Sequence, residues 1–193
     1  ACCPRRAKRW RRLFRSGRGV QVPPPPWHSG TVSVESIRSE ISFVDGRQSP
    51  TAFAIARGTA RLLRSLAFSC IAEMPLASGR RADLVALGPD GEFWIVEIKS
   101  SIEDFRADRK WPEYRWHCDR LFFATAPHVP LGIFPEDAGL ILADGYGAQI
   151  VREAPEHRLA GATRRSMLLR FGRMAAQRLQ DLTDPAAPAG AEF

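Results

Sequence analysis

Long apolar runs and cysteines are both scarce in this chain of 193 residues, and each scarcity excludes a class of protein. No stretch approaches about 18 uncharged apolar residues, so a membrane-spanning helix is excluded. Four cysteines are too few for a small protein built on disulfides, and no pair of them has the C-x-x-C spacing of a zinc site. Free thiols suit a reducing cytoplasm, where we expect this protein to act.

Lysine is also scarce. Only three of the 28 Lys and Arg residues are lysines, and beyond residue 20 only Lys99 and Lys110 remain. In a chain so biased toward arginine, a lysine indicates a position where the planar guanidinium of arginine cannot replace an ammonium. An ammonium is a compact point charge that loses its proton more readily when it is desolvated. Lys99 is therefore a candidate for orienting or deprotonating a water.

The net charge of +7 comes from one segment. Residues 1–20 hold eight Lys and Arg side chains and no acid, which leaves 20 basic and 21 acidic residues in the remainder. A basic face for nucleic acid on the folded part therefore does not follow from the net charge.

Residues 1–48 are rich in Arg and then in Pro, so we expect a disordered extension that buries no core. Two alternatives are an arm that grasps nucleic acid and a helix on a membrane surface. No apolar run of about 7–15 residues follows the basic start, so no signal peptide is expected. Because the first residue is Ala rather than Met, the sequence is expected to be a fragment or to carry an upstream extension.

The pattern over residues 49–181 predicts one α/β domain, with a flexible tail at 182–193. Ser49 and Pro50 suit the cap and first position of a helix, and apolar residues then recur at the helical period. A last helix is expected at 160–181, and another at 102–118 that Pro112 interrupts. Strands are expected at 68–76, 81–88, 92–99, 120–125, 139–143 and 148–152. This order predicts a mixed sheet covered by helices.

A hairpin over residues 81–100 carries the candidate chemistry. The turn Gly88-Pro89-Asp90-Gly91-Glu92 is typical of a three-residue loop with a glycine bulge. With this loop residue 88 faces residue 92, and counting outward places Asp83 opposite Glu97 on one face of the sheet. Lys99, two residues beyond Glu97, shares that face. A two-residue loop would instead separate the two acids.

The resulting cluster lies on a strand that is apolar on both faces and is therefore expected to be central. Two carboxylates and an ammonium in such a place must be paired or must hold a cation. Lys99 can neutralise one acid, whereas Mg²⁺, which prefers carboxylate oxygen, can neutralise both. The alternative is a buried salt-bridge cluster that fixes the strand register.

The pattern of Asp83, thirteen further residues and then Glu97-Ile98-Lys99 resembles the PD-(D/E)XK nuclease superfamily, although Arg81-Ala82 stands where a proline is common. The longer run over residues 79–124 closely resembles the MmcB family of bacterial DNA-repair proteins, which are regarded as candidate endonucleases. The similarity extends from about residue 50 to residue 179. It implies a restriction-endonuclease-like fold, a mixed β-sheet flanked by helices in a single domain.

The resemblance also implies roles at the site. Asp83 and Glu97 would bind Mg²⁺, or Mn²⁺ as a substitute, together with the carbonyl oxygen of Ile98. Lys99 would position or activate the attacking water. Glu73 is a possible further ligand, or else an ion-pair partner of a neighbouring arginine. Residues 50–68 contain no acid, which weakens the case for a second metal site.

Several residues are candidates for DNA contact, and some of them have a structural alternative. Lys110 and Tyr114 lie near where some relatives carry a Q-x-x-x-Y motif, and Tyr114 would otherwise pack in the core. Ser100 could donate to phosphate. Arg57 and Arg61 could neutralise phosphates or belong to a solvated helix face.

The resemblance implies a Mg²⁺-dependent DNA endonuclease in DNA repair, with DNA and other repair proteins as partners and a nucleoid-associated place in a bacterial cytoplasm. A noncatalytic member that binds DNA structures or scaffolds a repair complex is the alternative. A small metabolic enzyme is disfavoured, because no glycine-rich phosphate loop follows a strand and no Ser/His/Asp or Cys/His constellation is evident.

Overall fold

The computed structural model describes residues 49–184. The disorder expected for residues 1–48, and the tail expected beyond residue 184, lie outside this range. The helical elements are α2 (Pro50–Ser65), α3 (Ile102–Ala107), η3 (Trp111–His117), η4 (Leu131–Ile133) and α4 (Gly161–Thr183). The strands are β1 (Ser69–Pro75), β2 (Arg81–Leu87), β3 (Phe93–Lys99), β4 (Arg120–Thr125), β5 (Gly139–Ala143) and β6 (Ala148–Arg152).

The start of helix α2 and its close packing follow from residues in its sequence. The Ser49 side chain accepts a hydrogen bond from the amide of Ala52 at 3.1 Å, and Pro50 takes the first turn, where its missing N–H costs nothing. Gly58 is required because a Cβ there would lie 2.1 Å from the carbonyl oxygen of Asp144 and 2.4 Å from that of Gly147. The helix can therefore approach the turn between β5 and β6 closely.

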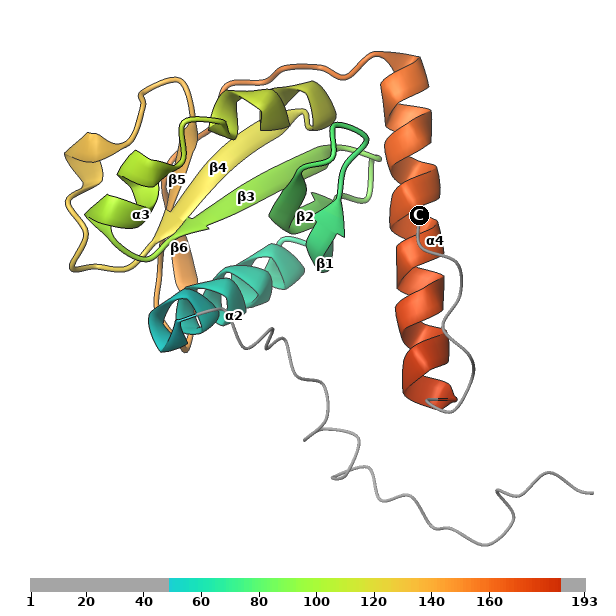
Figure 1. Ribbon diagram of the computed structural model, residues 1–193, viewed down its shortest axis with the longest axis horizontal. Coiled ribbons are helices and arrows are strands. Elements are labelled where there is room, and N and C mark those ends of the chain that lie inside the picture. Colours follow the sequence, from blue (N-terminus) through green and yellow to red (C-terminus); the bar gives the residue numbers. More distant parts are fainter. Residues whose placement is uncertain (1–48, 185–193) are drawn as a thin grey trace, which may run out of the picture. The chain divides into compact units, whose positions relative to one another are not determined.

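The six strands form one mixed sheet in the order β1-β2-β3-β4-β5-β6 (Figure 1). Neighbours β1/β2, β2/β3 and β5/β6 are antiparallel, whereas β3/β4 and β4/β5 are parallel. Strand β3 lies inside the sheet and every one of its residues is buried, which confirms the prediction of a central, covered strand.

Helices cover both faces of the sheet. On one face α2 packs Ile55 and Leu63 against the side of β3 that carries Trp94 and Val96. On the other face η3 and α4 cover the side of β3 that carries Phe93 and Ile95. Helix α3 and the segment around Phe134 cover the neighbouring part of that second face. Even-numbered residues of β3 therefore point to α2, and odd-numbered residues point to η3 and α4.

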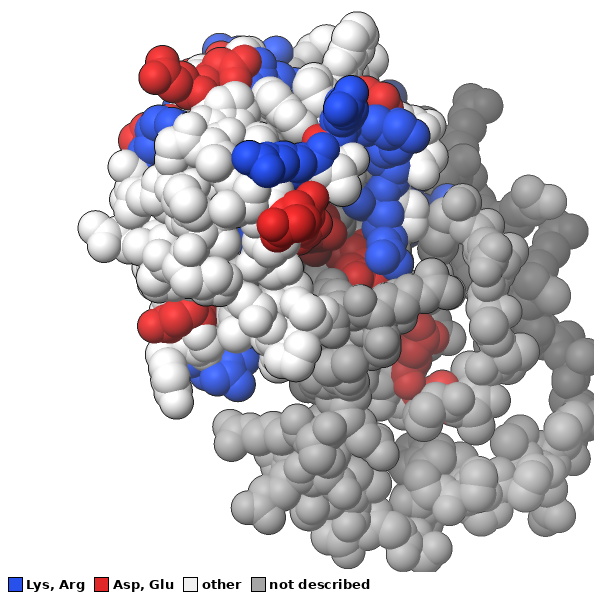
Figure 2. Space-filling view, turned by 60° about the vertical axis from the view of Figure 1, so that its left-hand side comes forward, with Lys and Arg blue, Asp and Glu red and all other residues white. Residues whose placement is uncertain are grey.

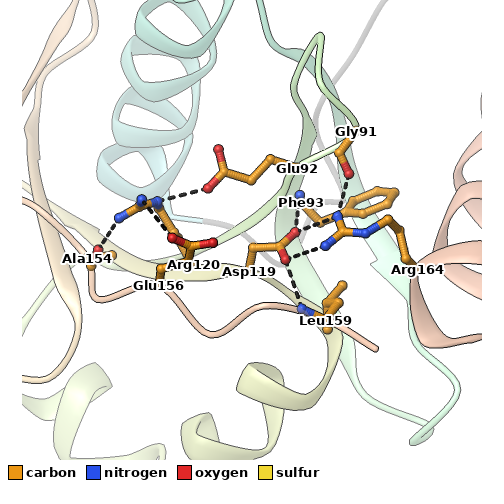
Figure 3. A network of polar contacts seen from close by, with 9 residues as sticks. All are labelled: Gly91, Glu92, Phe93, Asp119, Arg120, Ala154, Glu156, Leu159 and Arg164. Atoms are coloured by element: carbon orange, nitrogen blue, oxygen red, sulfur yellow. Dashed lines mark hydrogen bonds and ion pairs between the residues drawn. The ribbon is translucent and has the colours of Figure 1, made fainter. Parts of the chain in front are cut away.

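A buried carboxylate fastens α4 to the sheet (Figure 3). The two oxygens of Asp119 accept hydrogen bonds from the Arg164 guanidinium at 2.6 and 2.8 Å. They also accept from the amides of Phe93 at 2.8 Å and Leu159 at 2.9 Å. Only 3% of the Asp119 side chain is exposed, so these four donors replace nearly all of its hydration. One residue thus ties together β3, β4, the segment before α4 and α4 itself.

The predicted hairpin geometry is confirmed. The Gly88 amide donates to the carbonyl oxygen of Glu92 at 2.8 Å, and Gly91 adopts the left-handed φ of 80° that the bulge requires. Strand β2 then pairs with β3 so that Leu84 lies opposite Val96. The register predicted from the turn is the one observed.

The α/β fold class predicted from the sequence, a mixed sheet flanked by helices in a single domain, is confirmed and is consistent with a restriction-endonuclease-like fold. The element boundaries agree with the predictions within a few residues. The last helix continues to Thr183, past the expected end at residue 181, and α3 stops at Ala107. Among residues 49–184, no helix is long and apolar enough to cross a membrane.

Candidate functional site

A polar cleft of about 450 Å³ opens where β2 begins and β3 ends. The start of α2 and the segment from α3 to η3 both contribute to its lining. Its lining contains four carboxylates and one ammonium, and it includes the three residues that the sequence singled out. The lining residues are Ser49, Ala52, Asp83, Glu97, Ile98, Lys99, Ser100, Asp104, Asp108 and Tyr114.

At this end of the hairpin, hydrogen bonds from backbone amides to side chains replace the backbone pairing between β2 and β3. The last backbone pair toward the cleft is Leu84 with Val96. Beyond it the Asp83 amide donates to a carboxylate oxygen of Glu97 at 3.3 Å, and the Ile98 amide donates to a carboxylate oxygen of Asp83 at 2.8 Å. The Glu97 carboxylate thus accepts from the amide of Asp83, and the Asp83 carboxylate accepts from the amide of the residue after Glu97. Both side chains face the same cleft, as predicted.

The two carboxylates are in an environment that disfavours their negative charge. Burial, and then the neighbouring charge of Asp83, raise the pKa of Glu97 well above its ordinary value. Burial also raises the pKa of Asp83, and the Ile98 amide and Lys99 only partly oppose it. Because the Glu97 side chain is only 3% exposed, water gives it little compensation. The environment therefore favours the protonated forms of the two carboxyls as long as no cation lies beside them.

Lys99 pairs more closely with Asp108 than with Glu97. Its ammonium lies 2.6 Å from a carboxylate oxygen of Asp108 but 4.0 Å from the nearest oxygen of Glu97. Burial acts to lower the pKa of Lys99, but the hydrogen bond to Asp108 and the nearby carboxylates outweigh it, and the pKa is raised. The raised pKa favours the protonated form of Lys99, which can orient a water or offset negative charge.

Tyr114 and Ser100 line the cleft, but each is engaged by the protein. Tyr114 is buried, and its hydroxyl donates to the carbonyl oxygen of Arg81 at 3.1 Å. Burial and the carboxylates of the cleft raise the pKa of Tyr114, so it remains a neutral phenol. Both the amide and the hydroxyl of Ser100 donate to Asp104, at 3.0 and 3.2 Å. Contact of either residue with DNA stays a prediction.

The other predicted residues lie outside the lining of the cleft. Glu73 has a left-handed φ of 51° and forms an ion pair of 3.0 Å with Arg81, the arrangement given above as the alternative to a metal ligand. Arg57 and Arg61 donate to the carbonyl oxygens of Gly145 and Tyr146 in the turn between β5 and β6. Lys110 is exposed, and its amide donates to Asp108 at 3.0 Å.

Two acids of the cleft, Asp104 and Asp108, were missed by the sequence reasoning. Asp104 has a local signal, because its amide donates to the Ser101 hydroxyl at 3.1 Å in the capping arrangement of α3. Asp108 follows the last turn of α3, and its contact with Lys99 depends on how the chain folds back over β3. Spacing along the chain gives no signal for that contact.

The donors of the cleft fit a hard divalent cation. Asp83, Glu97 and Ile98 line one cavity, and the carboxylates of the two acids supply oxygen donors. Mg²⁺ is commonly held by one or two carboxylates and keeps several waters, for which the cavity has room. Within the part of the chain that the structure describes, no group of three or more His, Cys, Asp or Glu side chains is placed to hold a metal ion. Any ion here would therefore depend on two carboxylates, backbone oxygen and water.

Fold and cleft together define a class of protein: an α/β domain with a mixed sheet in which adjacent strands bring two carboxylates and a lysine to one opening. Over residues 39–186 the chain matches the family described as DNA repair protein MmcB-like, and it belongs to that family. The solved structure of a protein of unknown function from Silicibacter pomeroyi is similar, with 44% identity and a TM-score of 0.71. The match covers 76% of this chain and 99% of that one. Among curated proteins, none matches this chain.

Proposed function

We propose that this protein is a metal-dependent DNA endonuclease of the PD-(D/E)XK type in DNA repair, with Mg²⁺ as its ion and Mn²⁺ as a substitute. The observation that carries the proposal is the incompletely compensated pair of carboxylates. Asp83 and Glu97 share one cleft, whereas the nearby ammonium of Lys99 lies 2.6 Å from Asp108 and 4.0 Å from Glu97. A divalent cation would supply the missing positive charge.

The residues of the chain would then divide the work. Asp83, Glu97 and the carbonyl oxygen of Ile98 would hold the ion. Magnesium, when bound, would polarise a phosphodiester and make a bound water more acidic. Lys99, kept protonated by Asp108, would orient the attacking water and offset the charge that develops on the phosphate. Tyr114, with its hydroxyl bound to the Arg81 backbone, would form a fixed wall of the cleft.

DNA is the proposed substrate because the chain belongs to a DNA-repair family. The acidic lining would repel phosphate in the absence of a cation, so the ion would be needed for substrate approach as well as for chemistry. The face shown in Figure 2 carries basic and acidic side chains next to each other. Exposed Lys110, next to the cleft in sequence and space, is the first candidate for a phosphate contact.

The test is a cleavage assay with linear, nicked, flapped and branched DNA in Mg²⁺ or Mn²⁺. Wild type should cut at least one substrate, and Asp83→Asn and Glu97→Gln should each lower the rate by at least about 100-fold. Glu136→Gln is the matched control, because Glu136 is an exposed acid outside the cleft and its loss should leave the rate unchanged. Equal cleavage by all four proteins would indicate a contaminating nuclease and contradict the proposal.

A noncatalytic role in DNA-structure binding is the second candidate. It is favoured by the near-complete burial of Glu97 and Lys99, at 3% and 5% exposure. Melting curves in Mn²⁺ separate the two functions without an activity readout. A bound ion should raise the melting temperature of wild type but not of Asp83→Asn. DNA binding without cleavage and without this shift would support the noncatalytic role.

A further inference from the structure

The turn between β5 and β6 presents an aromatic side chain to solvent. Tyr146 is 83% exposed, in a turn where Gly, Asn, Asp or Ser would suit the backbone. Hydrogen bonds within the turn fix its shape, because the Asp144 carboxylate accepts from the amides of Tyr146 at 2.7 Å and Gly147 at 2.9 Å. The fold therefore positions this tyrosine without burying it.

Arginines on one side of α2 lie at this turn or next to it. Arg57 donates through Nε to the carbonyl oxygen of Gly145 at 2.8 Å, and Arg61 donates to that of Tyr146 at 2.8 Å. Arg64 lines one groove with both of them. Within residues 49–184, none of the three arginines forms an ion pair. The turn and these arginines together carry three positive charges and one negative charge.

A hollow beside Tyr146 approaches the acidic cleft. It has a volume of about 460 Å³, and Pro127 and Gln149 contribute to its lining. This volume is within the range of ligand pockets, about 300–1,000 Å³. The residue after Pro127 is His128, whose Nε2 lies 3.3 Å from the carbonyl oxygen of Ser100, and Ser100 lines the cleft. The hollow and the cleft are thus separated by little more than one side chain.

Helix α2 makes a second connection between the turn and the cleft. Ala52, in its first turn, lines the cleft. At the helical rise of about 1.5 Å per residue, Arg57 and Arg61 follow about 8 and 14 Å further along the helix axis. The aromatic ring, the arginines and the cleft therefore lie within reach of one short oligonucleotide.

An exposed aromatic ring beside arginines has the chemistry that binds single-stranded nucleic acid. Stacking needs a free base face, which a single strand offers, whereas the bases of a duplex are already stacked on each other. A guanidinium has five N–H donors, so Arg57 and Arg61 keep most of theirs for phosphate after their contacts with the turn. DNA is chosen over RNA because the chain belongs to a DNA-repair family.

We propose that Tyr146, Arg57, Arg61 and Arg64 form a platform for single-stranded DNA next to the cleft. A base stacks on the ring of Tyr146, and the arginines contact the phosphates on either side of it. The platform favours DNA with an unpaired strand, such as a flap, over an intact duplex. This inference rests on the proposed function for the choice of DNA, and it names the part of the substrate that the cleft does not contact.

Fluorescence anisotropy of the full chain tests the platform, with a labelled single strand of about 15 nucleotides and with a duplex of the same length. The buffer contains EDTA, so that no divalent metal binds and no metal-assisted cleavage occurs. Tyr146→Ala should weaken single-strand binding by about tenfold, as expected for the loss of one stacked base, and should change duplex binding by less than about twofold. Tyr146→Phe keeps the ring and should bind like wild type.

Trp116→Ala is the matched control for the aromatic ring. Trp116 is 76% exposed, but it belongs to η3, which covers the other face of the sheet. Its loss should leave single-strand affinity within about twofold of wild type. Arg64→Gln should reduce the slope of log affinity against log salt by about 0.7, the value of one phosphate contact on a single strand. Arg158→Gln, at an exposed arginine next to Leu159, should leave the slope unchanged.

The platform is overturned if Tyr146→Ala binds the single strand like wild type, or if Trp116→Ala weakens binding as much. Either result would leave Tyr146 to a protein partner or to solvent. An unchanged salt slope in Arg64→Gln would overturn the phosphate contacts. Because the assay contains no divalent metal, its outcome does not depend on cleavage. A selective loss in Tyr146→Ala, together with a wild type that cuts no DNA, would contradict the proposed endonuclease alone.

Discussion

At the residue scale, the cleft combines groups that a protein selected only for stability would avoid. Glu97 is buried beside Asp83, and the pKa of both carboxyls is raised. Lys99 is buried with a short ion pair to Asp108 rather than to either of them. Buried charges of this kind cost stability unless each is paired. The divalent cation proposed above would complete the pairing.

Neutralising Glu97 should stabilise the metal-free protein. Its raised pKa means that the folded state carries a cost that is absent below the ordinary carboxyl pKa and grows as the pH rises through the folded value. Glu97→Gln should thus raise the free energy of unfolding by about 1 kcal/mol at pH 8 in EDTA, and by nearly nothing near pH 4. Urea unfolding at the two pH values measures the difference. A loss of stability at pH 8 would show that the protein already compensates the charge.

Asp108 should act as a positioning residue for Lys99. Asp108→Asn removes the partner that raises the pKa of the ammonium. If cleavage needs the protonated lysine, kcat should fall by about tenfold with little change in KM, and the alkaline limb of the pH–rate profile should move to lower pH. Asp137→Asn, which alters an exposed partner of Arg115, should change neither. An unchanged profile in Asp108→Asn would remove Asp108 from the mechanism.

At the element scale, a single buried carboxylate adds a polar attachment to the apolar packing of Met167 and Phe171 that holds α4 on the sheet. Arg164 reaches Asp119 from the first turn of α4, and the amides of Phe93 and Leu159 reach the same carboxylate (Figure 3). Burial acts to raise the pKa of Asp119, but Arg164 and the two amides outweigh it and hold the pKa below its ordinary value. This polar part of the attachment is therefore electrostatic and is sensitive to acid.

Asp119→Ala should cost about 3 kcal/mol of unfolding free energy at pH 7, because it leaves a guanidinium and two amides without their acceptor. Since the pKa of Asp119 is lowered in the fold, its contribution is complete above the ordinary carboxyl pKa and is lost as the pH falls through the folded value. The gap between wild type and variant should therefore shrink at pH 3. Urea unfolding gives both values. Asp137→Ala, at an exposed pair, should cost less than about 1 kcal/mol at either pH.

The elements and the core of the site were predictable because their signals are local. Turn residues around Gly91 set the register that brings Asp83 opposite Glu97, and the strand pattern showed that β3 is covered. Contacts between distant segments were not predictable in the same way. Asp108 reaches Lys99 only after the chain folds back over the sheet, and Arg57 finds its acceptor 88 residues further along the chain, in the turn between β5 and β6.

At the scale of the whole molecule, the excess positive charge and the cleft belong to different parts of the chain. The eight basic residues of positions 1–20 account for the excess positive charge, while the remainder has 20 basic and 21 acidic residues. The face in Figure 2 shows both signs interspersed. DNA affinity contributed by residues 1–20 should therefore be separable from the cleavage proposed for the cleft.

Deleting residues 1–20 should weaken DNA binding without changing cleavage at saturating DNA. Up to eight phosphate contacts would be lost, so the slope of log affinity against log salt should decrease by up to about 7. Fluorescence anisotropy at several salt concentrations measures this slope. An unchanged slope would assign DNA affinity to the folded part.

The three-residue loop at 89–91 has an evolutionary consequence. Adding or removing a single amino acid there would turn Asp83 away from Glu97, so substitutions in this loop can be tolerated but changes in its length cannot. Homologues that preserve the cleft should keep this connection at constant length, and their insertions should accumulate elsewhere, as in the long excursion between Thr125 and Gly139.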